Sequence, residues 1–101
     1  MKRKMKPIHP GAVLREDVLK EMDLSITKAA TALEISRKQL SEIVNENASI
    51  TAEMALRLEQ GFGVSAEFWL DMQKKYDLWK VESSGKVRIH RIKKAQELTP
   101  P

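Results

Sequence analysis

The sequence predicts an all-α protein with a single small domain of five helices. Apolar residues recur at helical spacing in five separate stretches of the chain. A residue that suits a helix start opens or precedes each stretch, namely Pro10, Ser25, Ser36, Thr51 and Ser65. A chain of 101 residues is long enough for one domain with a modest core.

The first helix is expected over residues 11–22, where Leu14, Val18 and Met22 form an inward stripe. Pro10 suits an early helical position because its missing N–H would have no partner there. His9 is interpreted as a capping or packing residue, since the chain offers it no catalytic partner.

Residues 25–45 carry the most information about function. Ser25 is expected to cap a short helix that turns Ala29, Ala30 and Leu33 inward. Ala30 is small, which suits a place where two helices cross closely. Ile35 follows as an apolar plug for a tight turn. The pattern predicts two short helices joined by that turn.

The second of these helices is expected to begin after Ser36, with Gln39 completing a capping box. Its apolar residues Leu40, Ile43 and Val44 share one face. The remaining side chains form an outer polar row: Arg37, Lys38, Gln39, Ser41, Glu42 and Asn45. This is the layout of a helix-turn-helix that places its second helix in the DNA major groove. The alternative is an amphipathic hairpin with an ordinary solvated face. Position 34, in the turn, is often glycine in such motifs because the backbone there favours positive φ.

Two further helices are expected over residues 52–62 and 66–79. Ala55, Leu58 and Phe62 form the stripe of the fourth helix, and Gly63 is placed to end it in a left-handed conformation. The fifth helix has more apolar residues than one core stripe needs, which predicts a dimer. The predicted interface residues are Phe68, Trp69, Met72, Tyr76 and Trp79. The alternative is a thick single-chain core beneath the C-terminal tail.

The ends of the chain differ in charge from its middle. Residues 1–6 carry four basic groups and no acid (net +4), and residues 80–101 carry six basic and two acidic groups (net +4). Residues 7–79 carry eight basic and twelve acidic groups (net −4). We expect a basic tail over residues 1–6, a helical domain over 7–80, and a flexible or partner-ordered tail over 81–101. A break is expected at residues 83–85, then a short edge strand or partner-ordered segment over 86–92, with residues 98–101 frayed.

The composition also indicates what the protein is not. The chain has no cysteine and only two histidines, so we expect no enzyme, metal site or cofactor. We find no membrane-length apolar run and no signal-peptide pattern, which favours a cytoplasmic protein that contacts no membrane.

Several motifs resemble those of HigA-type antitoxins of bacterial toxin–antitoxin modules. The similar segments are Pro-Ile-His-Pro-Gly at residues 7–11, Leu-Arg at 14–15, Ser-Glu-Ile-Val-Asn at 41–45, Ile-Thr-Ala at 50–52, Ala-Leu-Arg-Leu at 55–58, Ser-Ala-Glu-Phe-Trp-Leu at 65–70 and Tyr-Asp-Leu at 76–78. They occur in the right order over residues 7–79.

The resemblance implies a five-helix DNA-binding fold of the Xre/Cro, lambda-repressor-like type. It also implies a homodimer that binds palindromic double-stranded operator DNA, represses its own operon and neutralises a RelE-like, HigB-type toxin that cleaves mRNA. By position, Arg37, Lys38, Gln39, Ser41 and Glu42 match the operator-reading helix, while Ser25 and Thr27 match the phosphate-contacting start of the preceding helix. We therefore predict this DNA-binding set: Ser25, Thr27, Ser36, Arg37, Lys38, Gln39, Ser41, Glu42 and Asn45.

The loop after the reading helix departs from the family pattern. The family usually has glycine at position 46 followed by basic residues, whereas this chain has Glu46, Asn47 and Ala48. Fewer basic residues mean fewer phosphate contacts and a flatter salt dependence. Two alternatives therefore stay open: a toxin-sequestering protein with weakened DNA binding, or a solitary Xre-family repressor without a toxin.

Overall fold

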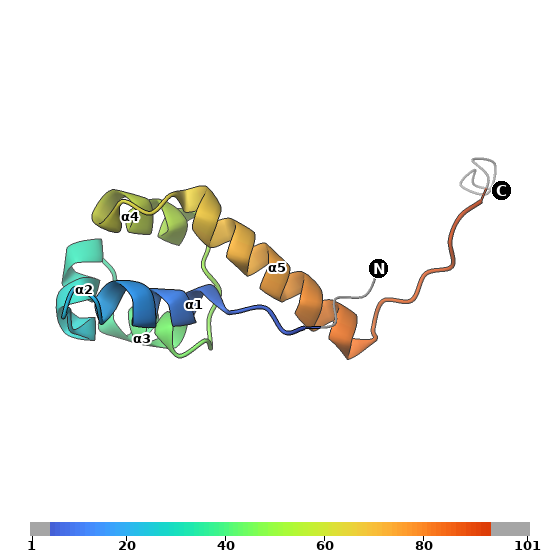
Figure 1. The fold of residues 1–101 in the computed structure, drawn as a ribbon, viewed down its shortest axis with the longest axis horizontal. Coiled ribbons are helices and arrows are strands. Elements are labelled where there is room, and N and C mark those ends of the chain that lie inside the picture. Colours follow the sequence, from blue (N-terminus) through green and yellow to red (C-terminus); the bar gives the residue numbers. More distant parts are fainter. Residues whose placement is uncertain (1–4, 94–101) are drawn as a thin grey trace.

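A computed structural model describes residues 5–93, and within this range every regular element is helical. The elements, in chain order, are α1 (Pro10–Val13), the π-helical segment η1 (Leu14–Leu19), α2 (Ile26–Leu33), α3 (Arg37–Val44), α4 (Ala52–Phe62) and α5 (Ala66–Ser84). The first four α-helices and η1 form a compact body, and α5 extends from it as a long rod (Figure 1). The all-α prediction is confirmed.

The predicted first helix is split between α1 and η1, which changes its inward face. Lys20 N–H bonds to Arg15 O and Leu24 N–H to Leu19 O, both five residues back. This wider π-helical turn brings Leu19 into the core after Leu14. The assignment of Met22 to the inward stripe was wrong, because Met22 lies beyond the helix and is 57% exposed.

The core lies where η1, α2, α3, α4 and the start of α5 meet. Its fully buried members include Leu14, Leu40, Leu58 and Trp69. Ala29 and Ala30 are also buried, as expected for a close crossing of α2 with its neighbours. Ile35 packs against this cluster from the turn between α2 and α3. The predicted inward faces of α2, α3 and α4 are therefore confirmed, except that Phe62 of α4 is only partly buried against this cluster.

Helix α5 is longer than the sequence pattern indicated. It ends at Ser84, where Gly85 adopts a left-handed conformation with φ of 68°. The predicted end at residue 79 was too early. The predicted break at 83–85 contains the true helix end at Gly85, although Ser83 and Ser84 are still helical. The expected domain boundary after residue 80 thus falls inside α5. The extended α5 and the tail give the molecule its longest dimension of 58 Å.

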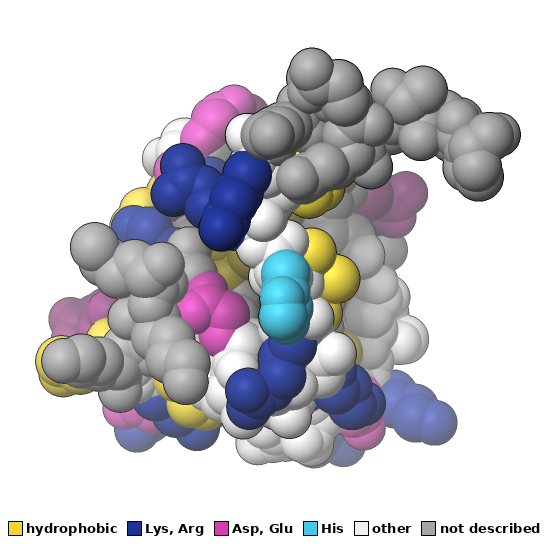
Figure 2. All heavy atoms as spheres, turned by 90° about the vertical axis from the view of Figure 1, so that its right-hand side faces the viewer, with side chains coloured by type: hydrophobic (Ala, Val, Ile, Leu, Met, Phe, Trp, Pro, Cys, Tyr) yellow, Lys and Arg dark blue, Asp and Glu magenta, His cyan; other side chains and the backbone are white. Residues whose placement is uncertain are grey.

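The described part of the C-terminal tail, residues 86–93, has no regular secondary structure. The predicted edge strand is absent there, and the apolar side chains Val87 and Ile89 are exposed to solvent. A strand needs a neighbouring ladder, and the described elements are all helical. Lys and Arg side chains gather over this end of the molecule (Figure 2). The prediction for residues 98–101 lies outside the described residues.

The segment before α1 runs along the side of α5 (Figure 1). The His9 ring meets the Tyr76 ring edge-on, with centroids 4.8 Å apart. Lys6 Nζ lies 5.8 Å from the centroid of the Trp79 ring. The chain thus covers part of its own aromatic face on α5, and Tyr76 and Trp79 remain half-buried.

Two residues at the start of α1 determine how it meets α3. His9 Nδ1 accepts a hydrogen bond of 2.9 Å from Gly11 N–H, which confirms the predicted capping role of His9. Gly11 lies directly against the backbone of α3, and a Cβ at this position would overlap the carbonyl oxygen of Ile43. The absence of a side chain at Gly11 therefore allows the two helices to touch.

We predict that Gly11→Ala destabilises the protein by about 1–3 kcal/mol, as overpacking of a rigid site does. The gain in helix propensity, about 1 kcal/mol, does not offset a clash with backbone. Urea denaturation measures the difference. Gly61→Ala is the matched control, because its added Cβ would meet only the end of the Leu33 side chain, at 3.0 Å. Equal stability of Gly11→Ala and wild type would contradict the close approach.

Burial makes the folded state sensitive to the protonation of His9. Desolvation lowers the pKa of His9 below its ordinary 6.5, against the smaller opposing effects of Glu46 and Asp77; Lys80 and Lys6 lower it further. As the pH falls through 6.5, the unfolded chain binds a proton at this position before the folded chain does, so stability falls. A protonated Nδ1 also cannot accept from Gly11.

We therefore expect the urea midpoint to decrease between pH 7.5 and pH 5.5. His9→Asn keeps a side chain that caps helices but does not titrate, so its midpoint should vary less over the same range. Parallel pH profiles for the two proteins would show that His9 is not the group responsible.

Candidate nucleic-acid interface

The two helices of the predicted motif begin at serine caps. Ser25 Oγ accepts from Lys28 N–H at 3.1 Å, and Ser36 Oγ accepts from Gln39 N–H at 3.0 Å. Between the helices, Glu34 adopts the left-handed conformation with φ of 58°, as expected for this position. This conformation costs a non-glycine residue about 1–2 kcal/mol. The sequence thus forms the turn without the glycine that relaxes it.

All nine predicted DNA-contacting residues lie at the surface. Eight are exposed and Ser41 is half-buried. At about 100° per residue, Lys38, Ser41, Glu42 and Asn45 lie along the middle of the outer face of α3, with Arg37 and Gln39 on its two flanks. The inner face of α3 is buried through Leu40, Ile43 and Val44, which leaves the polar row free to meet a ligand.

A shallow hollow joins the start of α2 to the outer face of α3. It is lined by Ile26, Arg37, Lys38, Ser41 and Glu42. Two basic side chains at the N-terminal end of a helix favour an anion such as phosphate, because the helix dipole has the same sign. Gln39 is not part of the hollow and faces the other side of α3.

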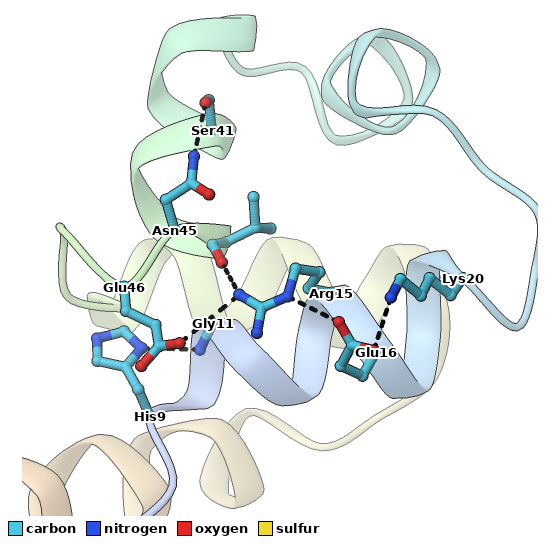
Figure 3. A network of polar contacts seen from close by, with 9 residues as sticks. His9, Gly11, Arg15, Glu16, Lys20, Ser41, Asn45 and Glu46 are labelled. Carbon is cyan, nitrogen blue, oxygen red and sulfur yellow. Dashed lines mark hydrogen bonds and ion pairs between the residues drawn. The ribbon is translucent and has the colours of Figure 1, made fainter.

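The carboxyl end of α3 presents a second polar pair. Asn45 Nδ2 donates to Ser41 Oγ at 3.2 Å, and both side chains lie on the outer face of the helix (Figure 3). The bond uses one of the two Asn45 N–H donors, so the other donor and the carbonyl oxygen remain available to a partner.

An arginine from η1 holds the same end of α3 from the other side. Arg15 Nη1 donates to the carbonyl oxygen of Val44 and lies 3.6 Å from Glu46 Oε2 (Figure 3). Its Nε donates to Glu16 at 2.8 Å, and Lys20 Nζ contacts the same carboxylate at 2.8 Å. These contacts, led by the one from Lys20, lower the pKa of Glu16.

A second arginine does the same for α2. Arg57, on α4, donates from Nη1 to the carbonyl oxygens of Leu33 at 2.9 Å and of Glu34 at 3.4 Å. Sequence reasoning missed both arginines as structural residues, because each bond joins positions more than 20 apart in the chain. The available signal was their presence in the Leu-Arg motifs at residues 14–15 and 56–57.

Glu46 stands where the family usually has glycine, and the structure shows what the glutamate does there. Glu46 is left-handed, with φ of 64°, which explains why glycine suits this position. Its carboxylate faces Arg15, so the glutamate introduces an ion pair that glycine cannot form. Both partners are about one-third exposed, and such pairs are worth about 0–1 kcal/mol.

The predicted dimer residues do not form one exposed surface. Trp69 is fully buried in the protein's own core, so its assignment to a dimer interface was wrong. It was misplaced because the sequence did not show which face of α5 the body covers. Phe68 is 43% exposed, while Met72, Tyr76 and Trp79 are half-buried.

The described residues contain no group of three or more His, Cys, Asp or Glu side chains that could hold a metal ion. Over the same residues, none of the helices combines the length and apolar character needed to cross a membrane.

Two capped helices, a left-handed turn and an exposed polar row on the second helix define the helix-turn-helix class of DNA-binding proteins. The helix-turn-helix family model matches residues 16–69, which is more than half of the chain. The chain belongs to the Xre-type helix-turn-helix family and, within it, to the HigA-type antitoxins. This is a class of transcriptional regulators and antitoxins, not of enzymes.

Relatives support this membership. Virulence-associated protein I of Dichelobacter nodosus is 51% identical over 77 residues, which cover 76% of this chain and 71% of that protein. Antitoxin HigA-1 of Vibrio cholerae is 32% identical over 78 residues, which cover 77% and 73% of the two chains.

Solved structures agree. The Pseudomonas aeruginosa antitoxin HigA, solved with the higBA promoter, is 40% identical with a TM-score of 0.76, over 78% of this chain and 86% of that one. Antitoxin GraA in complex with its operator is 36% identical with a TM-score of 0.75, over 91% and 99% of the chains.

Proposed function

We propose that this protein is an antitoxin that represses its own operon by binding operator DNA as a dimer, and that it neutralises a partner toxin. The observation that carries the DNA-binding part is the outer face of α3, which is polar and exposed while the inner face is buried. Similar proteins have been solved with promoter or operator DNA on the same fold. Such a partner would place the protein in the cytoplasm.

Each predicted residue has a role in this proposal. Arg37 and Lys38 would donate to guanine or phosphate, Gln39 would pair with adenine, and Glu42 would accept from cytosine. At the N-terminus of α2, Ser25 and Thr27 would meet phosphate. Ser36, Ser41 and Asn45 complete the contact surface as hydroxyl and amide groups, which bond bases or phosphates.

A dimer would present two copies of α3 about one helical turn of DNA apart. We propose that Phe68, Met72, Tyr76 and Trp79 contribute to its interface, because they form an apolar flank along α5. Phe68 is its most exposed member. Trp69 supports the flank from within the core and does not reach a partner.

We expect the purified protein to retard its own promoter fragment, in a complex that light scattering assigns to two chains per site. Arg37→Ala and Gln39→Ala should each weaken sequence-specific binding by about 1–3 kcal/mol. Lys74→Ala, an exposed change on α5, is the matched control and should bind as wild type does. The absence of a sequence-dependent shift at moderate salt would refute operator binding.

The toxin is the second part of the proposal. Residues 7–79 have a net charge of −4, which suits a basic RelE-like, HigB-type ribonuclease. The acidic residue at position 46 and the lack of basic residues after it also favour the variant of this function in which toxin capture outweighs DNA binding.

Co-expression with the neighbouring reading frame should yield a stable complex that co-purifies and does not cleave mRNA. Tight promoter binding without capture of the neighbouring product would instead identify a solitary Xre-family repressor. Capture without promoter binding would identify a protein that only sequesters the toxin.

A further inference from the structure

The contacts of Arg15 enclose one residue of the candidate DNA surface. Arg15 meets Val44 through its carbonyl oxygen and Glu46 through its carboxylate, and Asn45 lies between these two residues. Asn45 in turn bonds to Ser41 on the outer face of α3. One guanidinium therefore holds the backbone carbonyl before this outward-facing residue and the side chain after it (Figure 3).

The guanidinium is itself held in a fixed orientation. Glu16 accepts from its Nε at 2.8 Å, and Lys20 holds Glu16 from one turn further along. Gly11, one turn earlier on the same rod, lies against the Ile43 carbonyl. The rod formed by α1 and η1 thus contacts the backbone of Ile43 and of Val44 at the end of α3, and the side chain of Glu46 just beyond it.

The charges around Arg15 do not favour a direct role on DNA. Two carboxylates, Glu16 and Glu46, lie within 4 Å of its guanidinium, which leaves the site without a net positive charge. A phosphate would have to compete with both acids. Its planar fork is instead used for protein contacts with three separate groups, the Glu16 carboxylate, the Val44 carbonyl and the Glu46 carboxylate.

We propose that Arg15 is a positioning residue for the DNA-binding helix, acting through the Val44 carbonyl and the Glu46 carboxylate on the two sides of Asn45. By fixing the carboxyl end of α3, it sets the direction of the helix axis and the placement of the Ser41 and Asn45 side chains. This proposal rests on the proposed operator binding. Loss of Arg15 should reduce the recognition of one sequence over others more than it reduces attraction to DNA in general.

The test compares Arg15→Ala, Arg15→Lys and wild type on the promoter fragment and on a scrambled fragment of equal length, over a series of KCl concentrations. All measurements are made below the onset of unfolding of each variant. We expect Arg15→Ala to bind the promoter about tenfold more weakly, as loss of a charged hydrogen bond does. Binding to the scrambled fragment and the salt slope should stay unchanged. Arg15→Lys should be intermediate, because an ammonium group keeps the charge but not the fork.

Lys74→Ala is the matched control, since Lys74 is an exposed cation on α5 whose ion pair is with Asp71 on the same helix. It should bind both fragments as wild type does. An equal loss on both fragments, with the salt slope reduced by about one, would show that Arg15 contacts phosphate and would overturn the proposal. Unchanged promoter binding by Arg15→Ala would also overturn it.

A readout without DNA separates this proposal from the proposed function. Hydrogen exchange at the amides of Asn45, Glu46 and Asn47 should be faster in Arg15→Ala than in wild type, even if the wild-type protein fails to bind its promoter. If Arg15→Ala does not fold, Glu46→Gln removes the ion pair and keeps the left-handed residue's size; it should show a smaller change of the same kind. Wild-type exchange rates at these amides in every variant that folds would contradict the proposal.

Discussion

The contact between the backbone of α1 and the carboxyl end of α3 is the constraint on which the rest of the structure depends. Gly11 has no side chain, so α1 can lie against the Ile43 carbonyl, and His9 caps α1 at that point. The close approach brings Arg15 within reach of Val44. Without it, the inner face of α3 would lose its support on one side. The Pro-Gly pair at residues 10–11 thus allows close packing against a helix end that lies about 30 residues later in the chain.

The two helices of the motif, α2 and α3, are stabilised at their carboxyl ends in the same way. Each ends near a left-handed glutamate, Glu34 after α2 and Glu46 after α3. Each also has an arginine from another helix on its terminal carbonyl groups, Arg57 for α2 and Arg15 for α3. A cation at a helix C-terminus is favourable because it complements the helix dipole. Since these contacts lie on the inner side, the outer polar residues of α3 are not needed to hold the helix in place. They remain available to bind a ligand.

Helix α5 has two roles along its length. Its first turns complete the core through Trp69, and Gln73 ties the loop before α4 to the helix by accepting from Ile50 N–H at 2.9 Å. Further along, the segment that contains Lys6 and His9 covers part of the aromatic face. The remaining flank, with Phe68 at its exposed end, is the one assigned to the proposed dimer interface. The same helix therefore links the core, the N-terminal segment and the proposed dimer.

The sequence by itself determined where the helices begin, their N-terminal caps and the polar outer row of α3, because these depend on residues within a few positions of one another. Ser25, Ser36, Thr51 and Ser65 each cap the helix that they were predicted to cap. The tertiary structure alone decided which residues pack together from different helices. It produced the π-helical turn that buries Leu19 in place of Met22, the burial of Trp69 and the arginine contacts with helix ends. These features depend on residues that are distant in the chain, and no local pattern specifies which distant residue will make the contact.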